Sequence, residues 1–418
     1  MSEKLEKIKD ILKNYNQEEI LYILNNLKED EREKAIEDIL QLDFEQLNSL
    51  YNIVLKSKEE NIKIKNKIEP INYIEKERLN TQEREKYERL GENIIKNNKY
   101  AVVTMAGGQG TRLGHNGPKG TFDFGLASHK TIFEILCEKL KDAYKKYDVY
   151  IPWYIMTSKE NNSDTIEFFE KNGYFNYPKE NVIFFVQDEL PMLNEKGKII
   201  IGQDKRVKQA ADGHGGIFTS MEKNGIIENM KERKIEWLYI GGVDNVLANF
   251  ADPIFIGLAI DKNVLVAGKS LVKAYPEEKV GVFCMKDGKP SVIEYSEISK
   301  EMAEERDERG ELRYGESHIL CNLFNIKAIE QISKNKLPYH VAHKKCNYIN
   351  EKGELVIAEE PNAYKFEAFI FDAFERMEKM AILRVKREEE FAPIKNAQGE
   401  DSPETARRLY ENFNKIGG

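Results

Sequence analysis

A glycine-rich loop with two cationic side chains is the first feature of the sequence that could support catalysis. The run AVVTMAGGQGTRLGHNGPKG places Gly107 and Gly108 directly after an apolar segment that ends at Ala106, and Arg112 and Lys119 follow. Glycines let the backbone approach a ligand closely and direct several N–H groups at phosphate oxygens. Two fixed cations can neutralise a triphosphate and its leaving pyrophosphate. The loop therefore predicts a phosphate-binding site.

Two well-known phosphate-binding loops do not match this spacing. The dinucleotide fingerprint GxGxxG needs its last glycine at the position of Leu113, and the Walker loop needs Ser or Thr after its lysine, where Lys119 is followed by Gly120. The remaining alternative is a tight turn with solvated basic residues, which seldom requires so many glycines.

An acidic residue follows a second apolar run. In EWLYIGGVDN, Asp244 comes at the end of a predicted strand, where a carboxylate could hold a divalent cation against phosphates. The alternative is an aspartate that caps the next turn, although Asp252, which precedes Pro253, fits a turn better. The sequence thus proposes Asp244 as a ligand of Mg²⁺.

The elements around these motifs alternate between strands and helices. Short β-branched or aromatic runs at 100–106, 149–157, 181–187, 236–243 and 263–271 predict strands, and the period of 132–147 predicts a helix. Such alternation predicts an α/β fold, with a mostly parallel sheet covered by helices on both faces. Ligands of such sheets bind beyond the carboxyl ends of the strands, where both motifs lie.

The sequence divides into three stretches that differ in composition and in the spacing of apolar residues. Residues 1–95 lack glycine before Gly91 and repeat apolar residues at helical spacing, which predicts a helical N-terminal region. Residues 96–385 form the expected catalytic domain, and 386–418 a short arm of loop and helix.

Composition limits the cellular setting. Net charge is -8, with 41% hydrophobic and 33% charged residues, which argues against a broad nucleic-acid surface. No apolar stretch approaches the length of a membrane span, and no signal peptide is evident. The four cysteines form no CxxC pair, which predicts reduced thiols rather than disulfides or a zinc site. We expect a cytoplasmic protein.

AGGQGTRLG followed by PKG resembles the UDP-sugar pyrophosphorylase family, most closely its N-acetylhexosamine branch. Further blocks recur in order over roughly residues 95 to 410: FFVQ, ADGHGG, GGVDN, EYSEIS, CNLF, YHVAHKK, PNAYKFEAFIFD and EFAPIKNA. The resemblance implies a Rossmann-like nucleotidyltransferase fold of glycosyltransferase-A type, with a mixed, mostly parallel sheet.

The implied reaction joins UTP to N-acetylglucosamine 1-phosphate or N-acetylgalactosamine 1-phosphate, with Mg²⁺ as cofactor and pyrophosphate as leaving group. The sugar phosphate attacks the α-phosphorus directly, without a covalent enzyme intermediate. Three alternatives stay open: a UTP-glucose-1-phosphate uridylyltransferase, a non-catalytic UDP-sugar-binding protein, and a helical scaffold with a vestigial domain. The sequence leaves the oligomeric state open.

The resemblance also implies roles for individual residues. Arg112, Lys119 and Lys395 bind the reacting phosphates, and Asp244 binds the metal. The nucleotide is bound by Ala106, Gly107, Gly108, Gln187 and Gly213, of which Gln187 pairs with the edge of uracil. The sugar is bound by His214, Gly242, Glu294, Asn322 and Lys365, with Phe324 or Tyr295 as an apolar niche for the acetyl methyl group. Relatives often carry asparagine at the position of His214.

Overall fold

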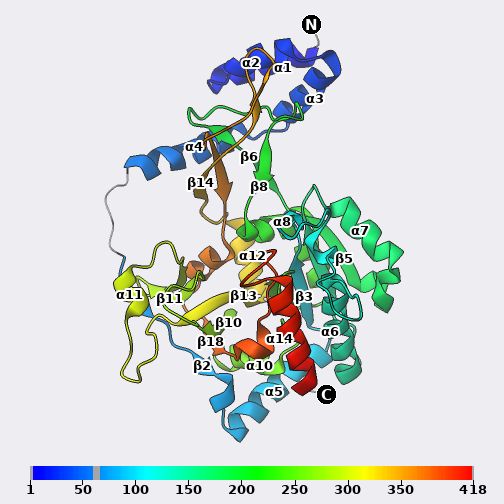
Figure 1. The fold of residues 1–418 in the computed structure, drawn as a ribbon, viewed down its shortest axis with the longest axis vertical. Helices are drawn as coiled ribbons and strands as arrows, with labels where there is room; N and C mark the ends of the chain where they lie inside the picture. The colour runs from blue at the N-terminus through cyan, green and yellow to red at the C-terminus, as the bar shows by residue number, and fades with distance from the viewer. Residues whose placement is uncertain (1–2, 60–65, 417–418) are drawn as a thin grey trace. The chain divides into compact units, whose positions relative to one another are not determined.

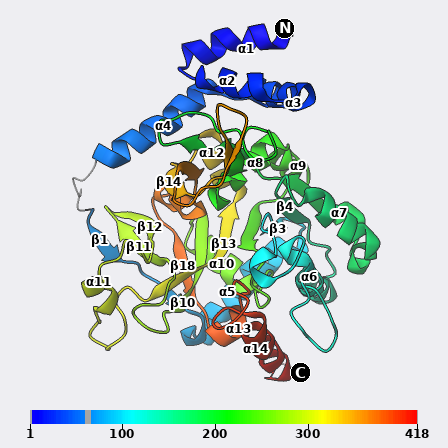
Figure 2. The ribbon, with the colours of Figure 1, turned by 45° about the horizontal axis from the view of Figure 1, so that its top comes forward.

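The computed structural model describes residues 3–59 and 66–416, which form two compact units (Figures 1 and 2). The first unit is drawn from 1–65, 188–216 and 337–369, and the second from 66–187, 217–336 and 370–418. This grouping differs from the ranges 1–95, 96–385 and 386–418 expected from the sequence, because both units are assembled from segments that are distant along the chain.

The first unit confirms the helical N-terminal region and adds strands to it. Its helices are α1 (Glu3–Asn14), α2 (Glu19–Asn26), α3 (Glu29–Leu40) and α4 (Phe44–Glu59). Its strands are β6 (Glu189–Pro191), β7 (Leu193–Asn194), β8 (Gln209–Ala211), β14 (His340–Lys344), β15 (Tyr348–Ile349), β16 (Leu355–Val356) and β17 (Ala363–Glu367), with the 3-10 turn η6 (His214–Gly216). The apolar faces of the helices share one core with Leu193, Ile201 and Phe366.

An 11-stranded sheet forms the centre of the second unit. Its main order is β2 (Ile74–Glu75), β18 (Ala381–Arg384), β10 (Val266–Val272), β13 (Glu316–Asn325), β9 (Trp237–Gly242), β3 (Tyr100–Met105), β4 (Trp153–Thr157) and β5 (Val182–Val186). Strands β9, β3, β4 and β5 are parallel, whereas β13 is antiparallel to both neighbours. Strands β1 (Ile68–Pro70), β11 (Val282–Lys286) and β12 (Lys289–Ile293) extend the sheet beside β13.

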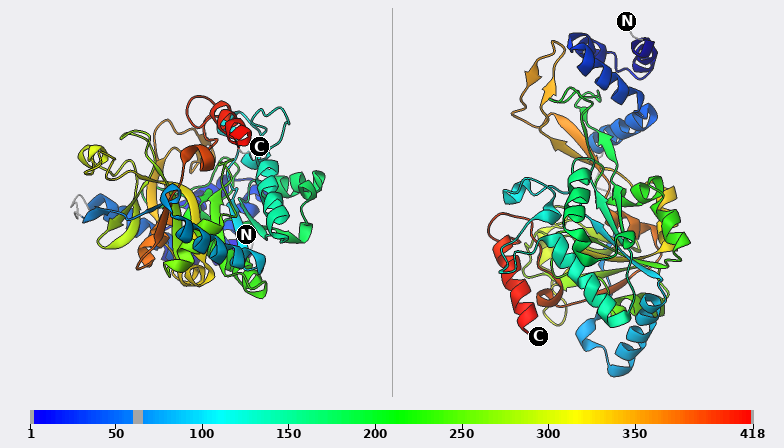
Figure 3. Two further views of the ribbon diagram at one scale, coloured as in Figure 1. Left: turned by 90° about the horizontal axis from the view of Figure 1, so that it is seen from below. Right: turned by 90° about the vertical axis from the view of Figure 1, so that its right-hand side faces the viewer.

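Every residue of β3 and β4 is buried, so both faces of the sheet are covered at its centre, as expected. The covering helices are α5 (Thr81–Lys96), α6 (Ile132–Tyr147), α7 (Asn162–Lys171), α8 (Ile217–Lys223), α9 (Ile226–Glu232), α10 (Pro253–Asp261) and α12 (Ile326–Lys334), with α11 (Lys300–Glu304), α13 (Arg387–Glu390) and α14 (Pro403–Ile416) at the periphery (Figure 3). None of the helices in the described ranges is long and apolar enough to cross a membrane.

Close packing of two helices explains why residues 66–96 belong to the second unit. A Cβ atom on Gly91 of α5 would lie 2.0 Å from the carbonyl oxygen of Pro253, and one on Gly257 of α10 would lie 1.9 Å from that of Tyr87. Only glycine permits such close contact between the two helix backbones. Helix α5 is therefore fixed to the sheet domain rather than to the N-terminal helices.

Candidate active site

The glycine-rich loop leaves the carboxyl end of β3 and folds back on itself. The amide of Gly110 donates to the carbonyl of Gly117 (2.9 Å), and the amide of Lys119 donates to that of Gly108 (3.0 Å). Space around Gly108 is open, with no atom within 4 Å of the position of a Cβ, and the Arg112 side chain is exposed. The loop thus offers accessible backbone beside two cations.

Two polar side chains from neighbouring strand ends lie against this loop. Asn161, which is fully buried after β4, donates from Nδ2 to the carbonyls of Ala106 (2.9 Å) and Gly108 (3.3 Å). Gln187 follows β5, and its Oε1 lies 3.0 Å from where a Cβ on Gly107 would stand. Gly107 therefore makes room for the predicted uracil-binding amide. Asn161 is a residue that sequence reasoning missed, although its place after a predicted strand was a usable signal.

The four predicted charged residues come together at the end of β3 and β9. Nζ of Lys119 lies 3.9 Å from Oδ2 of Asp244. Burial lowers the pKa of Lys119, the positive charges of Lys395 and Arg112 lower it further, and Asp244 opposes these effects. Three cations, Arg112, Lys119 and Lys395, therefore gather near Asp244, and such an electropositive cluster suits a polyphosphate.

The segment that carries Lys395 is paired with the turn at Asp244. Oδ1 of Asn245 accepts a hydrogen bond from the amide of Ala392 (2.9 Å), and its Nδ2 donates one to the carbonyl of Glu390 (2.8 Å). Nζ of Lys395 lies 3.3 Å from Oδ2 of Asp401, and the amide of Lys395 donates to the carbonyl of Asp401. Asp401, which sequence reasoning also missed, thus orients the lysine.

A buried ionic cluster holds Glu390, at the start of the segment that leads to Lys395, against the sheet. Lys269 of β10 is fully buried, and its Nζ lies 2.8 Å from Oε2 of Glu390 and 2.8 Å from Oδ2 of Asp252. Lys76 pairs with the same oxygen of Asp252 (2.7 Å). Burial alone would raise the pKa of Asp252, but the two lysines lower it well below its usual range. Asp252 also caps α10 by accepting from the amide of Ile254, consistent with the turn role expected for it.

The donor set around Asp244 fits a cation delivered together with phosphates. No group of three or more His, Cys, Asp or Glu side chains suited to a metal occurs within 3–59 and 66–416. Mg²⁺ needs only one or two carboxylates when phosphates and water complete its shell. A Cβ on Gly242 would lie 2.7 Å from Oδ1 of Asp244, so this glycine clears space for the carboxylate.

The predicted sugar ligands of the second unit lie on and beside β13. Asn322 is fully buried in β13, and its Oδ1 lies 3.1 Å from Nε2 of His318. Glu294 follows β12 and is half-buried. Phe324 is fully buried, as Asn322 is, and packs against the rings of Phe218 and Phe374, so its part in a niche for the methyl group stays a prediction. Tyr295 is 48% exposed.

Three other predicted ligands belong to the first unit. Gly213 has a φ of +84°, and a Cβ there would lie 2.3 Å from the carbonyl oxygen of Ala368, so only glycine fits. Burial lowers the pKa of His214 to about 4, so this imidazole is neutral at physiological pH. Nζ of Lys365 is 2.8 Å from Oε1 of Glu367. Their contacts with substrate stay a prediction.

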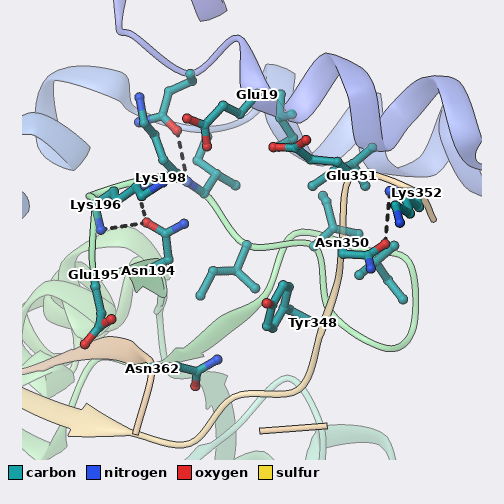
Figure 4. Close-up of a pocket in the computed structure, with 17 residues that line it drawn as sticks. Glu19, Asn194, Glu195, Lys196, Lys198, Tyr348, Asn350, Glu351, Lys352 and Asn362 are labelled. Carbon is teal, nitrogen blue, oxygen red and sulfur yellow. Dashed lines mark hydrogen bonds between the residues drawn. The ribbon is translucent and has the colours of Figure 1, made fainter. Parts of the chain in front are cut away.

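A cavity of about 500 Å³ in the first unit is lined by none of the predicted residues (Figure 4). Two of its polar side chains have partners within the unit: Asn194 accepts from the amides of Lys196 and Lys198 (2.9 Å each), and Asn350 accepts from that of Lys352 (3.0 Å). Its size alone therefore does not make it the catalytic centre.

Comparison with known proteins places these motifs in context. The family described as "UTP--glucose-1-phosphate uridylyltransferase" matches residues 44–400. The chain is 37% identical over 420 residues to UDP-N-acetylglucosamine diphosphorylase 2 of Arabidopsis thaliana, covering 95% of this chain and 82% of that protein. It is 40% identical over 344 residues to the UDP-N-acetylglucosamine pyrophosphorylase of Saccharomyces cerevisiae, covering 79% and 72%.

A solved structure agrees with these matches. The uridine diphosphate N-acetylglucosamine pyrophosphorylase of Trypanosoma brucei, crystallised with an inhibitor, superposes with a TM-score of 0.82 at 31% identity, over 98% of this chain and 84% of that one. The resemblance that the ordered motifs indicated is confirmed.

Proposed function

The chain belongs to the UTP--glucose-1-phosphate uridylyltransferase family, and from this premise we propose that it transfers the uridylyl group of UTP to N-acetylglucosamine 1-phosphate. The products are UDP-N-acetylglucosamine and pyrophosphate. The observation that carries the proposal is the convergence of Arg112, Lys119, Asp244 and Lys395 beside an open glycine-rich loop. The names of relatives at 37 and 40% identity favour this sugar over glucose.

Catalysis in this proposal consists of positioning and charge stabilisation. An oxygen of the sugar 1-phosphate attacks the α-phosphorus of UTP, and the bond to the β-phosphate oxygen breaks. The nucleophile is already an anion at neutral pH, so no side chain has to remove a proton. Arg112 and Lys119 hold the β- and γ-phosphates, and Lys395 stabilises charge between the reacting phosphates.

Asp244 would hold Mg²⁺ in this site. When bound, the ion supplies further neutralisation of the phosphate oxygens. Gly242 keeps Oδ1 of this carboxylate accessible, since a side chain at that position would collide with it.

The remaining residues determine which substrates fit. Gln187 and the loop at Gly213 recognise uracil, while Asn322 and Glu294 recognise the sugar, together with His214 and Lys365. A buried polar site that pairs with one substrate rejects an analogue that leaves its groups unpaired. The four cysteines are free and buried, as suits a reducing compartment, and the proposed location is the cytoplasm.

An assay of pyrophosphate release tests the proposal. UTP is supplied with N-acetylglucosamine 1-phosphate, N-acetylgalactosamine 1-phosphate or glucose 1-phosphate, and the three values of kcat/KM are compared. We expect an N-acetylhexosamine phosphate to exceed glucose 1-phosphate by about 10-fold or more. A higher value for glucose 1-phosphate would favour the glucose enzyme, and binding of UDP-sugar without pyrophosphate release would favour a binding protein.

A further inference from the structure

His318 and Asn322 form a polar pair on β13 in which only one member has a proposed role. The imidazole Nε2 of His318 lies 3.1 Å from Oδ1 of Asn322. We propose that His318 is a positioning residue that donates to this oxygen and so turns the amide nitrogen of Asn322 toward the acetamido carbonyl of the sugar phosphate. This inference rests on the proposed function, in which Asn322 recognises the sugar.

The amide nitrogen of Asn322 is a donor in need of an acceptor. Asn322 is 0% exposed, and its Nδ2 has no hydrogen-bond partner among the residues that the structure describes. A buried donor without a partner costs about 1–3 kcal/mol. The acetamido carbonyl of an N-acetylhexosamine can supply the acceptor, and glucose 1-phosphate has no such group at carbon 2.

The imidazole of His318 is held by aromatic rings. Its ring centroid lies 5.0 Å from that of Phe283, 5.8 Å from that of Phe374 and 6.1 Å from that of Phe371, all in edge-to-face geometry. These contacts restrict rotation of the imidazole, so its Nε2 has a fixed direction. An asparagine amide has nearly the same shape after a half-turn, and a fixed donor at Oδ1 removes that ambiguity.

A β-bulge lies between the two residues. Asn322 pairs with Gly268 and His318 with Ser270, so three residues of β13 face one residue of β10. Within the bulge Leu320 has a φ of +55°, a strained conformation for a branched side chain. Bulges and strained residues are frequent at functional sites, where they re-aim side chains. The bulge is the local feature that distinguishes this part of β13 from a regular strand.

Two substitutions at one position test the proposal. His318→Phe keeps an aromatic ring among its neighbours but removes the donor, and His318→Gln restores an N–H group. For His318→Phe we expect the preference for N-acetylglucosamine 1-phosphate over glucose 1-phosphate to fall about 10-fold, or about 1.4 kcal/mol, through a higher KM for the acetylated substrate. The KM for UTP should change much less. His318→Gln should recover part of the preference.

A double-variant cycle separates positioning from a general packing defect. In an Asn322→Ala background, His318→Phe should not lower the preference further, because the group it orients is gone. Equal losses for both sugar phosphates, equal behaviour of the Phe and Gln variants, or additive losses in the double variant would overturn the inference. If His318→Phe fails to melt like the parent protein, His318→Leu replaces it in the same cycle.

The failure of the proposed function would look different. A parent protein that releases no pyrophosphate from UTP with either sugar phosphate contradicts the function, and the inference falls with it. A parent protein that prefers the acetylated substrate, and keeps that preference in His318→Phe, overturns the inference alone.

Discussion

The phosphate end and the sugar end of the proposed site recognise their ligands by different physical means. At the phosphate end, the side chains of Lys119, Asp244 and Lys395 are 17, 23 and 46% exposed, and their proposed action is through charge. At the sugar end, Asn322 is 0% exposed, its Oδ1 is hydrogen-bonded to His318, and its proposed contact with the sugar is one directed hydrogen bond. Charge acts over distance and tolerates some solvent, whereas a neutral amide discriminates only where it is desolvated and oriented.

This difference implies that changes at the phosphate end lower the rate with every sugar phosphate, whereas changes at the sugar end alter the ratio between sugars. Lys269 links the two ends, because it holds Glu390 below Lys395 and is also the β10 residue that faces the bulge of β13.

The largest effect is expected from Lys269→Met. This change should impair the phosphate end and the sugar end together, because Lys269 contacts the structural support of both. It leaves two buried carboxylates with too little positive charge, at a cost of about 3–5 kcal/mol in the free energy of unfolding. Urea denaturation measures this loss. Lys300→Met, at a lysine whose side chain is 80% exposed, is the matched control and should change stability by less than about 0.5 kcal/mol.

Asp244→Asn should affect the phosphate end alone. We expect turnover to fall about 100- to 1,000-fold, because the metal loses its carboxylate, while the thermal midpoint changes little. Steady-state rates with each sugar phosphate test whether the loss is equal for both. Asp142→Asn, at an aspartate whose side chain is 68% exposed, should retain full activity. Near-normal turnover of Asp244→Asn would exclude this metal assignment.

The lowered pKa of Lys119 predicts a limit at alkaline pH. Lysine is a cation below its pKa, so kcat/KM for UTP should decline as pH rises through a value below the ordinary 10.4 or so. Lys119→Arg keeps the charge at all accessible pH values and should move the decline to higher pH. Lys119→Met should lower kcat/KM about 100-fold at neutral pH. Identical pH profiles for the parent and Lys119→Arg would contradict this role.

The smallest effect is expected from Asn161→Ala. It tests the comparison of the phosphate end with the sugar end, because it alters the phosphate-binding loop without removing a charge. The variant loses hydrogen bonds to the backbone of Ala106 and Gly108, and we expect the KM for UTP to rise about 10-fold. Asn172→Ala, at an exposed asparagine that ends α7, controls for general effects of such a change. An unchanged KM for UTP would show that the loop needs no such support.

Local patterns in the sequence were sufficient for much of the fold. Helix α6 occupies the predicted range 132–147, and strands β3, β4, β5, β9 and β10 lie within or overlap the predicted runs. These elements bury continuous apolar surface, so their own residues determine their conformation. The place of the charged set was also indicated by the sequence, because Asp244 directly follows one predicted strand, and Arg112 and Lys119 lie in the glycine-rich loop that follows another. The roles of these residues stay predictions.

Long-range register could not be predicted in the same way. The pair of His318 and Asn322 depends on a bulge in β13, and the cluster around Lys269 joins residues 76, 252, 269 and 390. The ring of Phe324 packs against Phe218 and Phe374, contacts that its place in the sequence did not indicate. A short stretch of sequence does not determine which distant side chain will contact a given residue.

The discontinuous first unit has a consequence for synthesis of the protein. Helices α1–α4 leave the ribosome early, yet the core that they share includes Leu193, Ile201 and Phe366. At about 5–20 residues per second, roughly 15–60 s separate the emergence of residue 65 from that of residue 369. The core around Ile8, Ile36 and Ile39 gains Leu193 and Ile201 partway through that interval and is complete only when Phe366 has emerged. The nascent chain therefore exposes apolar surface on its N-terminal helices for that time. A chaperone that binds amphipathic helices could bind this segment then.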